Sequence, residues 1–276
     1  YDLKTGRKVR TLPGHADSIT CVQFHGTTVV SGAKDHMIKI WRPLGHKWSK
    51  KIPFEEKTLF GHTKSVCCLD WRETDALLVS GGKDKKINLW DITSEMNVDC
   101  IYAPAIPYCI QLYNNQIVAG GKDRKIRIWD CDTSQQISVM KGHKGWVSCL
   151  QMSNHLIVSG GGDGTIRVFD TRTGQNTRTI KTETSIFSVG WITCLQWDEN
   201  KIVTGSADKY IRIHDIISGK CINTLKGHRD IVTGVQYDGQ KLLSSSLDRT
   251  VRVWDFSGST NSQNAPEQES PRCNVM

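Results

Sequence analysis

Histidine, serine and aspartate recur together along this chain, in sets such as His62, Ser80 and Asp84. These are the side chains of a nucleophilic triad, in which an aspartate orients the histidine that takes the serine proton. That chemistry also needs an accessible serine oxygen and an oxyanion hole beside open space. Because the set recurs in several places, an enzyme would need several identical active sites. We therefore predict a structural network, with no catalytic residues and no cofactor.

A glycine cluster from Gly160 to Gly164 is the second candidate for chemistry, in the segment "HLIVSGGGDGTIRVFD" at residues 155–170. A phosphate-binding loop would continue with lysine and serine or threonine and would open a helix. Neither signal follows these glycines. We interpret the cluster as a hairpin turn.

Cysteines are numerous, with ten in 276 residues, and could indicate a zinc site or disulfides. Five of them share one position of the repeat described below: Cys21, Cys68, Cys109, Cys149 and Cys194. The thiolates of a zinc site must converge to about 2.3 Å from one ion, which residues of different repeats do not do. We predict no metal, buried cysteines that act as small hydrophobic residues, and a reducing compartment, the cytoplasm or nucleus.

The elements that carry these residues are repeated. Relatives of segment 155–170 include "LLVSGGKDKKINLWD" and "KLLSSSLDRTVRVWD", and the copies end at Arg42, Asp91, Asp130, Asp170, Asp215 and Asp255. The period is close to the repeat of about 40–45 residues of a propeller blade. Each unit has the alternating and apolar patterns of short strands, with no helical pattern. We predict an all-β protein, with glycine and aspartate of the "SGxxD" turns supplying the positive φ of a tight hairpin.

The chain resembles the WD-repeat β-propellers from its first residue to about Phe256, because several copies carry "GH", "SGxxD" and "WD" in order. The resemblance implies a hydrogen-bonded tetrad of histidine, hydroxyl, aspartate and tryptophan within a blade. The complete sets are His15, Ser31, Asp35 and Trp41; His62, Ser80, Asp84 and Trp90; and His228, Ser244, Asp248 and Trp254. A fourth set has His143, Ser159 and Asp163, with Phe169 in place of tryptophan.

Two other units depart further from the tetrad. The unit ending at Asp130 has no "GH" and has Ala119 in place of the hydroxyl, which leaves Asp123 and Trp129. The unit ending at Asp215 keeps Thr204 and Asp208, but His214 replaces the tryptophan. Burying an unpaired carboxylate is costly. We expect these two blades, and the one with Phe169, to satisfy their buried groups in another way and to be the least stable.

Blade count follows from the strand sets. Six sets of first-to-third strands are present, and Tyr1-Asp2 resembles the end of another set. The stretch after Trp254 offers no predicted outer strand, so we expect the N-terminal side to supply it. We predict a propeller over residues 1–256 from a seven-bladed parent truncated at the N-terminus, with a disordered tail over 257–276. The alternative is a six-bladed ring in which Lys8 to Leu12 pair with the last blade.

Partner binding is implied for the face that carries the turns before each aspartate and the loops after each "GH". Three successive units place a lysine before the turn aspartate, and basic or aromatic residues lie near the same rim. These candidate partner-binding residues are Lys34, Lys83, Lys122, Lys64, Lys144, Arg229, Trp146 and Trp191. Clustered cations raise the affinity for anions. We expect acidic or phosphorylated segments of other proteins to bind here; the alternative is ordinary solvated lysine.

A net charge of +8 raises nucleic acid as a partner. Much of the excess is spread one residue per unit, as with Lys39, Arg127 and Arg167, and no basic stripe or known nucleic-acid module accompanies it. We predict no direct binding to nucleic acid. No run of about 18 apolar residues indicates a membrane span, and the ending "CNVM" fits a prenylation signal at Cys273 only loosely.

The predicted function is a non-catalytic scaffold for protein–protein interaction. Units such as "GVQYDGQKLLSSSLDRTVRVWD" resemble those of the substrate receptors of F-box ubiquitin ligases, which join a propeller to an upstream helical F-box. That resemblance implies a ligase adaptor as a partner through a region before residue 1. The alternative is a general scaffold of signalling, RNA-processing or chromatin complexes.

Overall fold

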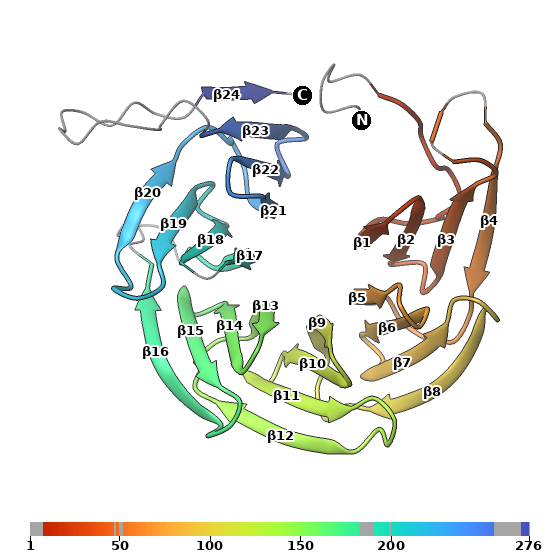
Figure 1. The fold of residues 1–276 in the computed structure, drawn as a ribbon, viewed down its shortest axis with the longest axis horizontal. Coiled ribbons are helices and arrows are strands. Elements are labelled where there is room, and N and C mark those ends of the chain that lie inside the picture. The colour runs from red at the N-terminus through yellow and green to blue at the C-terminus, as the bar shows by residue number, and fades with distance from the viewer. Residues whose placement is uncertain are drawn as a thin grey trace. The chain divides into compact units, whose positions relative to one another are not determined.

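The computed structural model describes residues 8–46, 48–49, 52–182, 190–198 and 200–256, and the backbone of residues 272–275. These residues form strands and turns without a helix, which confirms the all-β prediction. The strands build six four-stranded antiparallel sheets, one for each sequence repeat (Figure 1). The chain divides into two compact units, residues 1–141 and 142–276, and each unit contains three sheets. The Tyr1-Asp2 dipeptide lies outside the described residues.

Unit 1 contains sheets 1, 2 and 3, whose strands pair in chain order. Sheet 1 consists of β1 (Ile19–His25), β2 (Thr28–Ala33), β3 (Ile38–Pro43) and β4 (Phe54–Leu59). Sheet 2 consists of β5 (Val66–Arg72), β6 (Leu77–Gly82), β7 (Lys86–Asp91) and β8 (Met96–Tyr102). Sheet 3 consists of β9 (Pro107–Tyr113), β10 (Gln116–Gly121), β11 (Lys125–Asp130) and β12 (Gln136–Lys141).

Unit 2 contains sheets 4, 5 and 6, built in the same order. Sheet 4 consists of β13 (Val147–Ser153), β14 (Leu156–Gly161), β15 (Thr165–Asp170) and β16 (Gln175–Lys181). Sheet 5 consists of β17 (Ile192–Trp197), β18 (Lys201–Ser206), β19 (Ile211–Asp215) and β20 (Cys221–Leu225). Sheet 6 consists of β21 (Val232–Tyr237), β22 (Lys241–Ser246), β23 (Val251–Asp255) and β24 (Arg272–Val275).

The outer strand of sheet 6 corrects one expectation. The sequence offered no strand after Trp254, yet β24 pairs with β23 from Arg252↔Val275 to Asp255↔Arg272. An exposed strand edge presents unpaired backbone N–H and C=O groups, and a four-residue segment is long enough to pair with them here. The intervening residues 257–271 lie outside the described part of the chain.

The hydrophobic cores lie between neighbouring sheets of the same unit. In unit 1, Val30 and Ile40 of sheet 1 belong to one buried cluster with Leu69 and Trp90 of sheet 2. In unit 2, Val158 and Ile166 of sheet 4 cluster with Ile192 and Ile202 of sheet 5. In sheets 1 to 5 the second strand has pairing partners on both edges and apolar contacts on its faces, so its residues are mostly buried.

The repeated cysteine interlocks with a glycine on the neighbouring strand. Cys68 of β5 lies opposite Gly81 of β6, and a Cβ added at Gly81 would lie 2.8 Å from the Cys68 sulfur and 2.6 Å from Pro107 of sheet 3. Burial raises the pKa of the Cys21, Cys109 and Cys194 thiols to about 12. These thiols are therefore neutral packing groups. Among the described residues, no group of three or more His, Cys, Asp or Glu side chains could hold a metal ion.

The positive φ of the hairpin turns falls one residue later than expected. It is carried by the residue after the turn aspartate in all six sheets: His36, Lys85, Arg124, Gly164, Lys209 and Arg249, with φ from 65° to 77°. The aspartate itself accepts the amide of the second residue after it, as in Met37 N to Asp35 Oδ1 at 3.0 Å. That hydrogen bond holds the turn, so five sheets tolerate a side chain where glycine would be favoured.

Candidate functional site

In sheet 2 the structure brings His62, Ser80, Asp84 and Trp90 into one hydrogen-bonded chain. The His62 Nε2 lies 2.8 Å from Ser80 Oγ, and His62 Nδ1 lies 3.0 Å from Asp84 Oδ2. Trp90 Nε1 donates to Ser80 Oγ at 2.8 Å. The chain therefore joins the loop before β5, the turn before β7 and the two central strands of the sheet.

The direction of this chain follows from its ends. An indole N–H can only donate and an ionised carboxylate can only accept, so Ser80 donates to His62 Nε2 and His62 Nδ1–H donates to Asp84. Burial lowers the pKa of His62 despite the nearby carboxylate, which keeps the ring neutral near pH 7. Burial would raise the pKa of Asp84, but hydrogen bonds from the Thr63 amide and His62 outweigh it and keep the carboxylate ionised.

The connectivity is that of a nucleophilic triad, but the serine is closed to substrate. The exposed fraction of Ser80 is 0%, and its oxygen already accepts the Trp90 indole proton. A nucleophile needs a substrate carbonyl within reach of its oxygen. The network pins loop, turn and strands together.

Sheet 6 contains the same chain. His228 Nε2 lies 2.8 Å from Ser244 Oγ, His228 Nδ1 lies 2.8 Å from Asp248 Oδ2, and Trp254 Nε1 donates to Ser244 at 2.9 Å. The Asp248 carboxylate also accepts the backbone amide of Arg229 at 2.9 Å. Burial would raise the pKa of Asp248, but these hydrogen bonds and one from Thr250 hold it well below its usual range.

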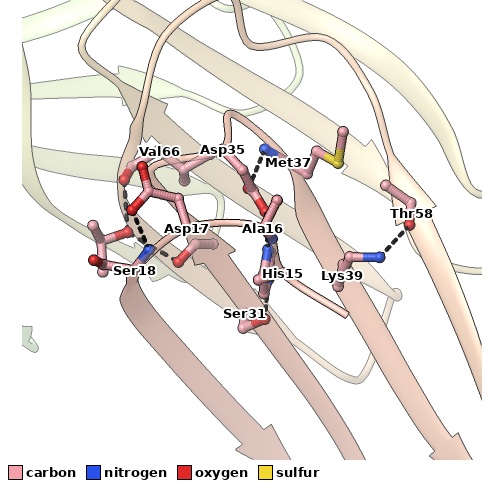
Figure 2. Close-up of polar contacts among 12 residues, drawn as sticks. His15, Ala16, Asp17, Ser18, Ser31, Asp35, Met37, Lys39, Thr58 and Val66 are labelled. Carbon is pink, nitrogen blue, oxygen red and sulfur yellow. Dashed lines mark hydrogen bonds and ion pairs between the residues drawn. The ribbon is translucent and has the colours of Figure 1, made fainter. Parts of the chain in front are cut away.

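Sheet 1 forms only part of the chain. Figure 2 shows His15 between Asp35 and Ser31, and the two distances are 2.8 and 2.7 Å. The indole Nε1 of Trp41 is buried and has no hydrogen-bond partner among the described residues. Trp41 instead packs edge-on against His15, with ring centroids 5.6 Å apart.

Sheet 4 has the histidine, serine and aspartate of the tetrad but no tryptophan. His143 lies 2.8 Å from Ser159 Oγ and 3.2 Å from the Asp163 carboxylate, and Phe169 fills the tryptophan position. Ser159 Oγ also lies 3.4 Å from the carbonyl of Arg167.

In sheets 3 and 5, which lack the "GH" histidine, arginine takes its place beside the turn aspartate. Arg127 pairs with Asp123 through two contacts of 2.6 and 3.1 Å, and Arg212 pairs with Asp208 at 2.7 Å. The sequence predicted that these blades satisfy their buried aspartates without a histidine. It did not identify the arginines as the partners, because they were interpreted only as part of the distributed positive charge. The available signal was an arginine four residues after an aspartate in a repeat without "GH".

His214 does not replace the tryptophan chemically. Both of its ring nitrogens are buried without hydrogen-bond partners in the described part of the chain. Burial and then the charge of Arg212 lower the pKa of His214 to about 4, so the ring is neutral near pH 7. Thr204 instead lies within 3.4 Å of the Arg212 carbonyl, so the hydroxyl of sheet 5 bonds to backbone.

The residue before each turn aspartate is held in the same way in every sheet. Its backbone amide donates a hydrogen bond to the carbonyl of the residue directly before the first strand, with N–O distances of 2.8 or 2.9 Å. The pairs are Lys34–Ser18, Lys83–Ser65, Lys122–Ile106, Gly162–Trp146, Ala207–Trp191 and Leu247–Ile231. Unit 1 therefore presents an exposed lysine at this position in each of its sheets, whereas unit 2 presents small or apolar residues beside Trp146, Trp191 and Ile231.

The other predicted surface residues are also exposed. Lys144 and Arg229 directly follow the histidine of their sheet, and the turn aspartate accepts their backbone amides at 2.6 and 2.9 Å. In sheet 2 Asp84 accepts the amide of Thr63 instead, and Lys64 is the next residue. Trp146 and Trp191 form an edge-to-face pair with centroids 5.5 Å apart.

The order of histidine, hydroxyl, aspartate and aromatic residue in successive sheets is that of a known family. Residues 6–42, 54–91, 107–130, 134–170, 177–215 and 219–255 match the family described as "WD domain, G-beta repeat", or WD40. The chain belongs to the WD40 family. Its six sheets are six WD40 β-propeller blades, three in each unit.

Several known proteins are similar to parts of this chain. The APC/C activator protein CDH1 of Saccharomyces cerevisiae is 35% identical over 95 residues, which are 34% of this chain and 16% of the relative. The anaphase-promoting complex subunit cdc20 of Dictyostelium discoideum is 34% identical over 100 residues, 34% of this chain and 18% of the relative. The nuclear distribution protein nudF of Aspergillus niger is 29% identical over 121 residues, 42% of this chain and 23% of the relative. The matched parts are thus less than a quarter of each relative.

A solved structure extends the similarity over most of the chain. The crystal structure of the computationally designed Ika8 protein aligns with a TM-score of 0.72 at 30% identity, covering 93% of this chain and 76% of that one. In the described residues, no helix is long and apolar enough to cross a membrane.

Proposed function

We propose that this WD40 chain is a non-catalytic protein-interaction module that binds acidic or phosphorylated segments of other proteins. The observation that carries the proposal is the set of turn lysines Lys34, Lys83 and Lys122, which occupy one position in three successive sheets. Each backbone is fixed by a hydrogen bond, and each side chain is exposed. None of the three forms an ion pair with another described residue.

Free cations at fixed positions favour an anionic ligand. An ordered backbone lowers the entropy cost of binding, and like charges in one region strengthen the field that steers an anion. A solvated lysine that serves only solubility needs no such repetition. The buried serines of the tetrads support the non-catalytic part of the proposal.

Charge reversal tests the turn lysines. The variant Lys34→Glu/Lys83→Glu/Lys122→Glu should lose at least about ten-fold in the retention of acidic and phosphorylated peptide pools, since about 1.4 kcal/mol is a factor of ten. The matched control is Lys201→Glu/Lys220→Glu/Lys241→Glu, three exposed lysines at hairpins away from the turn aspartates. Equal peptide retention by the two variants would refute the assignment.

We propose that this module is the substrate receptor of a ubiquitin ligase. Two of the similar proteins carry the anaphase-promoting complex in their names, which supports a role in a large assembly that recruits other proteins. The F-box type rests on the resemblance of single repeats and is tested separately. Affinity capture of the full-length protein, followed by mass spectrometry, should recover ligase adaptor or cullin subunits; recovery of RNA-processing or chromatin complexes would support the general scaffold instead.

A further inference from the structure

Sheet 4 carries a cavity of about 350 Å³ that none of the tetrads explains. Among the described residues, its lining includes Lys144, Arg167 and Lys181 as cations, Asp163 as the one carboxylate, and the hydroxyl residues Thr165 and Thr179. All of these residues belong to sheet 4 or to the loop that leads into it, inside unit 2. The volume lies within the usual range for small-ligand sites.

Arg167 pairs with no carboxylate among the described residues, because a histidine contacts the turn aspartate where arginine does so in sheets 3 and 5. Arg127 and Arg212 occupy the same position of the third strand in sheets 3 and 5 and pair with their turn aspartates. In sheet 4 His143 bonds to Asp163 instead. The buried Nε of Arg167 consequently has no hydrogen-bond partner among the described residues.

The carboxylate of the cavity is already occupied. Asp163 accepts the Lys144 amide at 2.6 Å, the Thr165 hydroxyl at 2.8 Å and the Thr165 amide at 3.1 Å, in addition to His143. Burial would raise the pKa of Asp163, but the hydrogen bonds from His143, Lys144 and Thr165 outweigh it, so the carboxylate stays ionised. Three cations against one carboxylate leave an excess of two positive charges on the described residues of the lining. No described carboxylate forms an ion pair with Lys144, Arg167 or Lys181.

An aromatic surface adjoins the cavity. Trp146 and Trp191 are 38% and 41% exposed, and Trp191 directly follows Gly190 of the lining. Trp146 packs onto Gly162, where an added Cβ would lie 2.5 Å from the indole ring. The glycine thus lets the ring lie beside the turn that contains Asp163.

We propose that this cavity, the sheet-4 anion pocket, binds the phosphate of a phosphorylated side chain in a partner protein, while an apolar residue next to that side chain contacts Trp146 and Trp191. A phosphate monoester carries between about −1.5 and −2 charges at pH 7, which the excess of two positive charges balances. Arginine offers paired donors for its oxygens. The exposed indoles favour a peptide over a free ion, because they supply apolar contact area outside the pocket.

The inference deepens the proposed function, and its test separates the two. The probes are nonapeptide pools with a fixed central phosphoserine and the same pools with serine. The chain should retain the phosphorylated pool at least about ten-fold better, which corresponds to about 1.4 kcal/mol. Arg167→Gln/Lys181→Gln should abolish that preference, and Trp146→Ala should weaken retention of peptides with an apolar residue beside the phosphoserine. Lys201→Gln/Lys241→Gln, which removes two exposed lysines at the starts of β18 and β22, is the charge-matched control and should change nothing.

A second variant guards against loss of folding. Lys144→Gln/Lys181→Gln alters only exposed side chains and should lower the phosphate preference by several-fold without changing the thermal midpoint. If both pocket variants bind like the unmodified chain while the turn-lysine variant loses binding, the pocket inference is wrong and the proposed function stands. If the turn-lysine variant binds normally and the pocket variants do not, the pocket is supported and the turn lysines are not the site. Binding to vesicles that contain a phosphoinositide, with no phosphopeptide preference, would also overturn the inference.

Discussion

Trp90 donates its indole proton to Ser80 at 2.8 Å, whereas the equivalent Trp41 makes no such bond to a described residue. The two residues are buried to the same degree, at 1% exposure each. Comparing the two residues therefore separates the contribution of the hydrogen bond to stability from the contribution of burying the ring.

Phenylalanine tests this difference, because it is the residue found naturally at position 169. Trp90→Phe should destabilise the chain by about 1 kcal/mol more than Trp41→Phe, since it removes a satisfied hydrogen bond while the other removes an unsatisfied donor. Urea unfolding monitored by circular dichroism measures both. Equal losses in the two variants would mean that the indole bond contributes nothing.

The buried ion pair of sheet 5 gives a second prediction. The side chains of Arg212 and Asp208 are 7% and 3% exposed, so Arg212→Gln would leave a buried carboxylate without its cation. Breaking such a pair costs about 3–5 kcal/mol. Arg172→Gln is the control, because Asp170 keeps the hydrogen bond from the Arg172 backbone amide at 2.9 Å and the arginine side chain is 68% exposed; it should cost clearly less than Arg212→Gln. A similar cost for both substitutions would contradict the burial argument.

Asp70 makes stability depend on pH. In β5 it accepts the Leu112 amide at 2.7 Å and Gln23 Nε2 at 3.0 Å, a position that Gln151 and Gln196 fill in sheets 4 and 5. Burial raises the pKa of Asp70 to about 6, above the unfolded value of 3.8. The folded state thus binds the proton more tightly, and its stability falls as the pH rises through the window from 3.8 to about 6.

Glutamine should remove that dependence. Asp70→Gln keeps an acceptor for the Leu112 amide without an ionisable group, so it should gain up to about 3 kcal/mol relative to the unmodified chain between pH 4 and pH 8. Denaturant unfolding at the two pH values measures the gain. A difference between variant and unmodified chain that stays constant with pH would show that Asp70 does not titrate in this range.

The hairpin turn of sheet 2 allows a matched test of backbone strain. Lys85 has a φ of 65°, where glycine is favoured, and Lys86 begins β7. Lys85→Gly should be neutral or stabilise by up to about 1 kcal/mol, while Lys86→Gly should destabilise by about 0.5–1 kcal/mol. Thermal midpoints of the two variants should move in opposite directions or differ clearly; a common downward shift would argue against strain at Lys85.

Sequence patterns predicted the sheets better than their edges. The repeat of "SGxxD" and "WD" defined the three inner strands because those residues make local turns and buried contacts. The outer strand β24 was not predicted, because its formation depends on the exposed edge of β23 and not on a strand pattern in the sequence of Arg272–Val275. The sequence pattern assigned the positive φ to the glycine and aspartate of the turns, whereas the structure places it on the next residue, such as Lys85 or Arg124.

The candidate site divides in the same way. The family signature named His62, Ser80, Asp84 and Trp90, which the structure brings together. It could not distinguish Trp41 from Trp90, because the orientation of an indole is decided by packing. The role of Arg127 beside Asp123 depends on a missing histidine elsewhere in the repeat, so it becomes visible only when the two side chains are placed in space.

The relay from Trp90 through Ser80 and His62 to Asp84 has a fixed polarity, with every proton directed toward the carboxylate. A proton added to the imidazole would turn Nε2 from acceptor to donor, so Ser80 would have to direct its own hydrogen away from His62 and the order of the relay would be lost. The arginines that pair with the turn aspartates in sheets 3 and 5 keep their protons throughout the pH range in which an imidazole titrates, so they do not respond in this way. Because burial lowers the pKa of His62, the folded chain holds this ring neutral, and its protonation at low pH would weaken the connection between loop, turn and strands in sheet 2.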